Sequence, residues 1–170
     1  TDYNWEVHEK DILITVGAQE AMALAIQVVC ENGKYAVAFE DPSYIGFSKY
    51  ADLTGVEGVS VPVDATNTLD LVRLEEQLKI QIEKGRPIKL VNIIPDFQNP
   101  TGALMPLEKR NRILELAEEF DFYLFEDNAY GIFQYEGERL PFVKQLDVSN
   151  RVIYVESFSK SLFPSIRMAS

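Results

Sequence analysis

The run Ile88-Lys-Leu-Val-Asn-Ile-Ile94 decides the fold, because it is short and almost wholly apolar. A strand with one face in water alternates apolar and polar residues, whereas a strand covered on both faces is a nearly continuous apolar run. Five further short runs are rich in apolar or β-branched residues, and they cover residues 12–16, 35–39, 56–63, 122–125 and 152–155. We therefore predict a sheet that is covered on both of its faces.

Segments rich in helix formers separate these runs, and they cover residues 18–31, 44–53, 69–84 and 106–119. In the third segment Leu71, Leu74 and Leu78 recur at helical spacing, which predicts an amphipathic helix. Strands that alternate with helices of this length indicate a mostly parallel sheet. The expected fold class is a three-layer α/β sandwich with helices on both faces of the sheet. We expect one domain over residues 1–170 and no second domain within the chain.

The composition is ordinary for a soluble globular protein, with 46% hydrophobic and 25% charged residues in a chain of 170. A net charge of −11 argues against a nucleic-acid surface on this segment, because such a surface needs clustered lysine and arginine. No apolar run is long enough to span a bilayer, so we expect no membrane partner. The single Cys30 and single His8 exclude an internal disulfide and a His/Cys metal cluster, which favours a reducing, cytoplasmic setting without metal.

Unusual residues gather where the predicted strands end. In open parallel α/β sheets, ligands bind at the carboxyl ends of the strands. The segments at these ends are Gly17-Ala-Gln19, Glu40-Asp-Pro-Ser-Tyr44, Asp96 to Gly102, Glu126 to Tyr130 and Ser157 to Lys160. We therefore expect these loops to converge on one edge of the sheet and to form the functional site there.

The stretch from Ser157 to Arg167 combines a lysine amine, hydroxyl groups and a guanidinium group. The Ser157 and Ser159 hydroxyls and the Arg167 guanidinium could hold a phosphate while the Lys160 amine forms a Schiff base with an aldehyde on the same ligand. The competing interpretation is a surface lysine. The backbone N–H groups of Ala18 and Gln19, at the start of a predicted helix, could assist with the phosphate, although such a sequence is more often a simple turn.

Four polar or aromatic residues could contact a ring on that ligand. Asp127 follows a buried strand, where an unpaired carboxylate is costly, so it could pair with a protonated pyridine nitrogen or cap the next turn. The amide of Asn99 and the hydroxyl of Tyr130 could donate to a ring oxygen, or they could belong to an ordinary turn and loop. Tyr44 could stack on the ring or pack in the core.

Together these motifs resemble the fold-type I, aspartate-aminotransferase-like superfamily of enzymes that depend on pyridoxal 5′-phosphate (PLP). The sequence of these motifs is most similar to two branches, the 2-aminoadipate/kynurenine-type aminotransferases and the aminotransferase-like domain of MocR/GntR-type transcription regulators. The similar stretches are Glu40-Asp-Pro-Ser-Tyr44, Pro95-Asp-Phe-Gln-Asn-Pro-Thr-Gly102 and Phe158-Ser-Lys-Ser-Leu-Phe-Pro164. The resemblance spans nearly the whole chain.

The resemblance implies a role for each candidate residue. Lys160 would be the Schiff-base lysine, Asp127 would contact the pyridine nitrogen, and Tyr44 would stack on the ring. Asn99 and Tyr130 would contact the ring hydroxyl. The phosphate would be held by a set of four residues, Ala18, Gln19, Ser157 and Arg167. Ser159 is left out of that set.

The resemblance also implies that the chain is part of the large PLP-binding domain, without the small domain and the N-terminal segment. Ser165 stands where glycine is common in this branch. We expect a homodimeric PLP-dependent aminotransferase acting on an amino acid and a 2-oxo acid, with this piece weak or inactive alone. The alternative is the PLP-binding effector domain of a MocR/GntR-type regulator without turnover, which a winged-helix segment upstream would favour.

Overall fold

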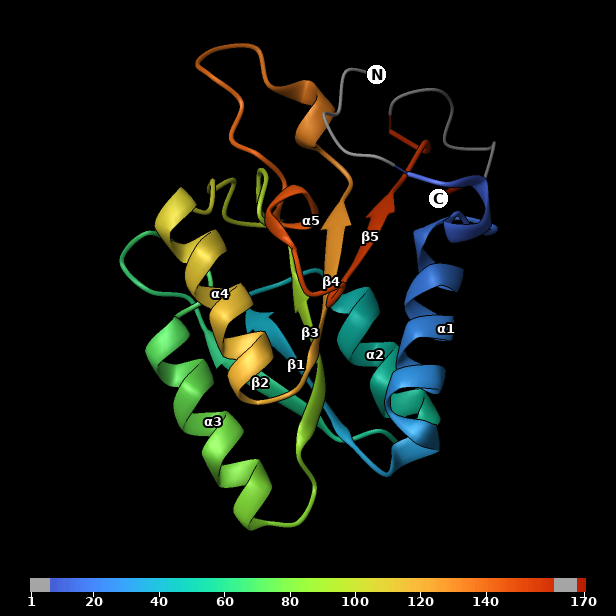
Figure 1. Cartoon of the computed structure of the whole chain (residues 1–170), viewed down its shortest axis with the longest axis vertical. Coiled ribbons are helices and arrows are strands. Elements are labelled where there is room, and N and C mark those ends of the chain that lie inside the picture. The colour runs from blue at the N-terminus through green and yellow to red at the C-terminus, as the bar shows by residue number, and fades with distance from the viewer. Residues whose placement is uncertain (1–6, 161–167) are drawn as a thin grey trace.

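A five-stranded parallel sheet forms the centre of the protein (Figure 1). The structure is a computed structural model that describes residues 7–160 and 168–170. The strands lie in the order β2-β1-β3-β4-β5, and each runs parallel to its neighbours. Their bounds are β1 (Ala36–Asp41), β2 (Gly58–Pro62), β3 (Ile88–Ile93), β4 (Tyr123–Asn128) and β5 (Val152–Glu156).

Helices cover both faces of this sheet. They are α1 (Ala18–Val29), α2 (Ile45–Thr54), α3 (Leu71–Glu83), α4 (Leu107–Glu119) and the short α5 (Val143–Leu146). Figure 1 shows α1 and α2 on one side of the strands and α3 and α4 on the other. In β3, Leu90 packs in the core beneath α1 and α2, whereas Val91 and Ile93 pack beneath α3 and α4. The three-layer α/β fold with helices on both faces is therefore confirmed.

The strand predicted at residues 12–16 is wrong. Within the described part of the chain, this segment pairs only through Thr15, in an isolated antiparallel bridge to Ala169. Leu13 and Ile14 are 64% and 71% exposed, so the apolar run does not mark burial here. Periodicity cannot distinguish a run that is covered by a neighbouring strand from one that is not.

β1 and β4 run past their predicted ends at residues 39 and 125, so Glu40 and Glu126 lie within buried strands. Backbone N–H groups from other segments compensate these acids. The Glu126 carboxylate accepts hydrogen bonds from Val143 N at 2.9 Å and Lys144 N at 2.8 Å, at the start of α5. Burial still raises the pKa of both glutamates to about 7, because desolvation outweighs these bonds.

Among the described residues, no helix is long and apolar enough to cross a membrane. In the same part of the chain, no group of three or more His, Cys, Asp or Glu side chains could hold a metal ion. Cys30 is fully buried, and desolvation raises the pKa of its thiol to about 12. The thiol is therefore a packing group and is not poised for reaction.

Arg110 of α4 is the largest fully buried side chain and joins three segments. Its guanidinium group donates to Met105 O at 2.9 Å, to Pro141 O at 3.0 Å and to the Asp96 carboxylate at 2.6 Å. A buried ion pair that loses one partner leaves an uncompensated charge. Arg110 therefore anchors the loop after β3 and the segment before α5 to the helix layer.

Arg110→Ala should lower the free energy of unfolding by about 3–5 kcal/mol, because the Asp96 carboxylate would stay buried without its cation. Urea denaturation measures this loss. Arg112→Ala on the same helix is the matched control. Arg112 forms partly exposed ion pairs with Glu115 and Glu75, so its removal should lower the free energy of unfolding much less. Similar losses in the two variants would contradict the role given to Arg110.

Candidate functional site

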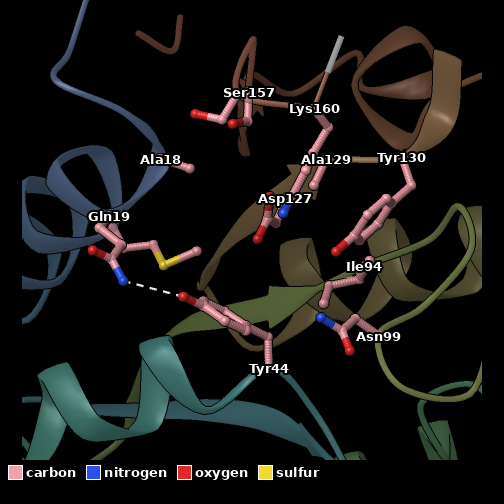
Figure 2. A pocket seen from close by; sticks show the side chains of 12 residues that line it. Ala18, Gln19, Tyr44, Ile94, Asn99, Asp127, Ala129, Tyr130, Ser157 and Lys160 are labelled. Atoms are coloured by element: carbon pink, nitrogen blue, oxygen red, sulfur yellow. Dashed lines mark hydrogen bonds between the residues drawn. The ribbon is translucent and has the colours of Figure 1, made fainter. Parts of the chain in front are cut away.

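A pocket of about 180 Å³ opens at the carboxyl edge of the sheet (Figure 2). Its lining comes from α1, the loop before α2, the ends of β3 and β4, and the loop after β5. The lining residues are Ala18, Gln19, Met22, Tyr44, Ile94, Asn99, Asp127, Ala129, Tyr130, Ser157, Ser159 and Lys160. The structure thus brings eight of the nine predicted cofactor-binding residues to one cavity. The ninth, Arg167, lies outside the described residues, as does Ser165.

Three lining residues had not been singled out from the sequence. Met22 lies one helical turn after Ala18 on α1, a spacing that places both on one face of the helix. Ile94 directly follows β3, and Ala129 lies in the turn between Asp127 and Tyr130. Their positions beside predicted site residues were the available signal, but small and aliphatic side chains carry no chemical pattern.

Asp127 is the last residue but one of β4 and pairs with Val155 of β5. The residue is only 6% exposed, and its Oδ1 has no hydrogen-bond partner among the described residues. Burial alone raises the pKa of this carboxyl to about 7. Most buried polar groups are hydrogen-bonded, so an unpaired carboxylate oxygen at the floor of a pocket requires an explanation.

Lys160 lies in the turn after β5, and Figure 2 shows its side chain pointing into the pocket, towards the end of β4 that carries Asp127. Ser159 also lines the pocket, and its buried Oγ has no hydrogen-bond partner in the described chain. A primary amine and a buried carboxyl therefore face one small cavity. This pair suits a ligand that carries both a group reactive towards amines and a cationic or donor group.

The start of α1 forms another wall of the pocket. Gly17 precedes the helix with φ 83°, a conformation that residues with a Cβ rarely adopt, and it provides no side-chain cap. The N–H groups of the first helical turn, at Ala18 and Gln19, lie at the positive end of the helix dipole, where anions are stabilised. The Gln19 side chain donates to Tyr44 Oη at 3.1 Å, which links this wall to the aromatic ring across the pocket.

The segment 168–170 holds the α1 wall beside the lysine loop. Ala169 pairs with Thr15 on one side and with Ser157 on the other, in isolated antiparallel bridges. Thr15 N donates to Ala169 O at 2.9 Å, and Phe158 N donates to Met168 O at 3.1 Å. Three short backbone segments, around Thr15, Ser157 and Ala169, thus bring residues that are far apart in the sequence to one pocket.

A parallel sheet with helices on both faces and a pocket at the carboxyl ends of its strands is the architecture of α/β ligand-binding proteins. Within this class, the family model for aminotransferase class I and II matches residues 2–165. The chain therefore belongs to the aminotransferase class I and II family.

Two relatives illustrate the range of this family. The chain is 39% identical to (S)-3,5-dihydroxyphenylglycine transaminase of Amycolatopsis orientalis, over 98% of this chain and 37% of the relative. It is 37% identical to the HTH-type transcriptional regulator TauR of Rhodobacter capsulatus, over 93% of this chain and 30% of that protein. An enzyme and a regulator therefore share this segment.

A solved structure agrees with the fold. The crystal structure of Pyrococcus horikoshii kynurenine aminotransferase, in complex with PMP, matches with a TM-score of 0.88 and 35% identity. The match covers 99% of this chain and 41% of that one. The chain thus spans less than half the length of each of these proteins.

Asp127→Asn should stabilise the protein at pH 8 by on the order of 2–4 kcal/mol and should have little effect near pH 4. With its pKa at about 7, native Asp127 keeps a proton that the unfolded chain loses above about pH 4. Wild-type stability should therefore fall as pH rises from about 4 to about 7, and the variant lacks this contribution.

Urea denaturation of the two proteins between pH 4 and pH 8 measures this difference. Glu40 and Glu126 also make stability fall as pH rises, but they do so equally in both proteins, so their effect cancels in the comparison. Asp52→Asn makes the same chemical change at an exposed position of α2 and serves as the control. A gap between wild type and Asp127→Asn that does not change with pH would contradict the environment described for Asp127.

Proposed function

We propose that this chain forms the cofactor-binding part of a PLP-dependent aminotransferase, which transfers an amino group between an amino acid and a 2-oxo acid. The observation that carries the proposal is the unpaired Asp127 oxygen, buried in the same pocket that Lys160 enters. Membership of the family supports the reaction class. Because the chain spans less than half of its relatives, the activity is proposed for a protein that contains this segment.

The donor set fits PLP group by group. The cofactor's protonated pyridine nitrogen would donate to Asp127, and its charge would compensate a carboxylate that is costly to bury. The aldehyde would bond to the amine of Lys160. The phosphate would lie against the first turn of α1, with the N–H groups of Ala18 and Gln19 and the hydroxyl of Ser157 as donors.

When bound, PLP supplies an electron sink that stabilises negative charge at the substrate α-carbon. The other steps belong to residues of this chain. Lys160 would hold the cofactor and later carry a proton to and from the α-carbon. Asp127 would keep the pyridine nitrogen protonated, and Asn99 and Tyr130 would donate towards the ring oxygen. Tyr44 would lie against the ring, held by its hydrogen bond from Gln19.

A second candidate function rests on the regulator relatives. The similarity to TauR, at 37% identity, supports a ligand-binding domain that holds PLP without turnover. Both functions use the same pocket. Adding amino acids to the PLP-loaded protein and measuring 2-oxo acid release separates them, because only an aminotransferase forms product continuously when 2-oxoglutarate is also present. The homodimer and the cytoplasmic location stay predictions.

Addition of PLP to this chain should produce a visible absorption band, and borohydride reduction should fix a phosphopyridoxyl group on the peptide that contains Lys160. The attachment is expected because a lysine amine in a pocket with phosphate donors captures an aldehyde covalently. Spectrophotometry and peptide mass spectrometry measure the two effects.

Lys160→Ala should lose both the band and the adduct. Lys49→Ala, at an exposed position on α2, is the matched control and should retain both. If Lys160→Ala keeps the same band and the same adduct, Lys160 is not the covalent anchor. If wild type shows neither, the proposed function fails.

A further inference from the structure

Gln98 is a buried polar residue that is not assigned to the pocket lining. It directly precedes Asn99 and is only 1% exposed. Its Nε2 donates to Pro42 O at 2.7 Å, and its Oε1 accepts from Thr101 N at 2.9 Å. One side chain therefore bonds within its own loop and to a residue 56 positions earlier in the sequence.

These two loops carry different walls of the pocket. Pro42 lies two residues before Tyr44, and Gln98 lies one residue before Asn99. Figure 2 shows the side chains of Tyr44 and Asn99 on neighbouring walls of the cavity. The Gln98 backbone also closes its own loop, since Gln98 N donates to Ala103 O at 2.9 Å. A rigid loop is thereby bonded to the loop of Tyr44.

The environment allows only one orientation of the Gln98 amide. A rotated amide would place its oxygen against Pro42 O and its NH₂ group against Thr101 N–H, so both bonds would be lost. Glu40 favours the same orientation, because its Oε2 accepts from Gln98 Nε2 at 3.4 Å. The same carboxylate oxygen accepts from Ile94 N at 3.3 Å, and Ile94 lines the pocket.

We propose that Gln98 is a positioning residue that holds the Tyr44 loop and the Asn99 loop at a fixed separation before the cofactor ring enters between them. The inference rests on the proposed function. A loop that is already ordered loses little conformational freedom on binding, so the hydrogen bonds of Gln98 increase cofactor affinity without touching the cofactor. Gln98 thus differs in role from Tyr44 and Asn99, which face the pocket.

The test compares Gln98→Met with Gln81→Met, which makes the same change at a second buried glutamine. Gln81 lies on α3, is 2% exposed and donates to Glu57 Oε1 at 3.1 Å, outside the pocket. Two readouts are used on this chain. Hydrogen exchange without cofactor reports on the backbone amides of residues 43–46 and of residues 98, 99 and 101–103, and titration with PLP reports on affinity.

Gln98→Met should increase exchange in both loops and should weaken PLP binding about tenfold or more, while Gln81→Met should leave both readouts within about twofold of wild type. Gln98→Asn keeps the amide but is one methylene shorter. It should give the same two effects and replaces Gln98→Met if that variant does not fold.

Faster exchange in only one of the two loops would overturn the inference, because Gln98 would then not connect them. Equal losses of PLP affinity in Gln98→Met and Gln81→Met would also overturn it, since a general loss of stability would explain both. PLP binding by Gln98→Met equal to that of wild type overturns the inference and leaves the proposed function standing. Failure of wild type to bind PLP overturns the proposed function. Hydrogen exchange in the two loops then still tests whether Gln98 connects them.

Discussion

The burial of the Asp127 carboxyl is the constraint on which the site depends. β4 continues through Asp127, so the strand itself carries this group to the floor of the pocket. Glu126, one residue earlier, is compensated by two backbone N–H groups at the start of α5, whereas Asp127 Oδ1 has no partner in the described structure. The difference between these neighbours distinguishes a structural acid from one that is available to a ligand.

Parallel topology explains how the rest of the site forms around Asp127. All five strands point the same way, so the segments after β1, β3, β4 and β5 leave the sheet at one edge. Buried polar bonds then fix these segments to one another. Arg110 ties the loop after β3 to the helix layer, and Gln98 ties that loop to the one before α2. The pocket walls are therefore held by residues that do not line the pocket.

Local sequence was enough to predict the sheet, four helices and the convergence of the loops. An almost wholly apolar run such as 88–94 indicates a strand that is covered on both faces, and the alternation of strands and helices leaves few topologies. The error at residues 12–16 arose because an apolar run does not show which strand, if any, lies beside it. The run is mostly exposed, and among the residues that the structure describes only Thr15 of this run forms a bridge.

The lining residues with distinctive chemistry could also be predicted, because Lys160, Asp127 and Asn99 stand at strand ends in a recognisable order. The residues that position them could not. Glu40 receives bonds from Leu69 and Ile94, and Gln98 bonds Pro42, so their environments exist only after distant segments have packed. A glutamate or glutamine in a sequence gives no sign that it will be buried.

On the proposed function Asp127 pairs with a cationic ring nitrogen, and one measurement tests this pairing directly. PLP labelled with ¹⁵N at the pyridine nitrogen would be bound to the chain at pH 8 and observed by NMR. The pyridine nitrogen should be protonated in wild type and neutral in Asp127→Ala. A neutral nitrogen in wild type, or the same chemical shift in both proteins, would contradict it.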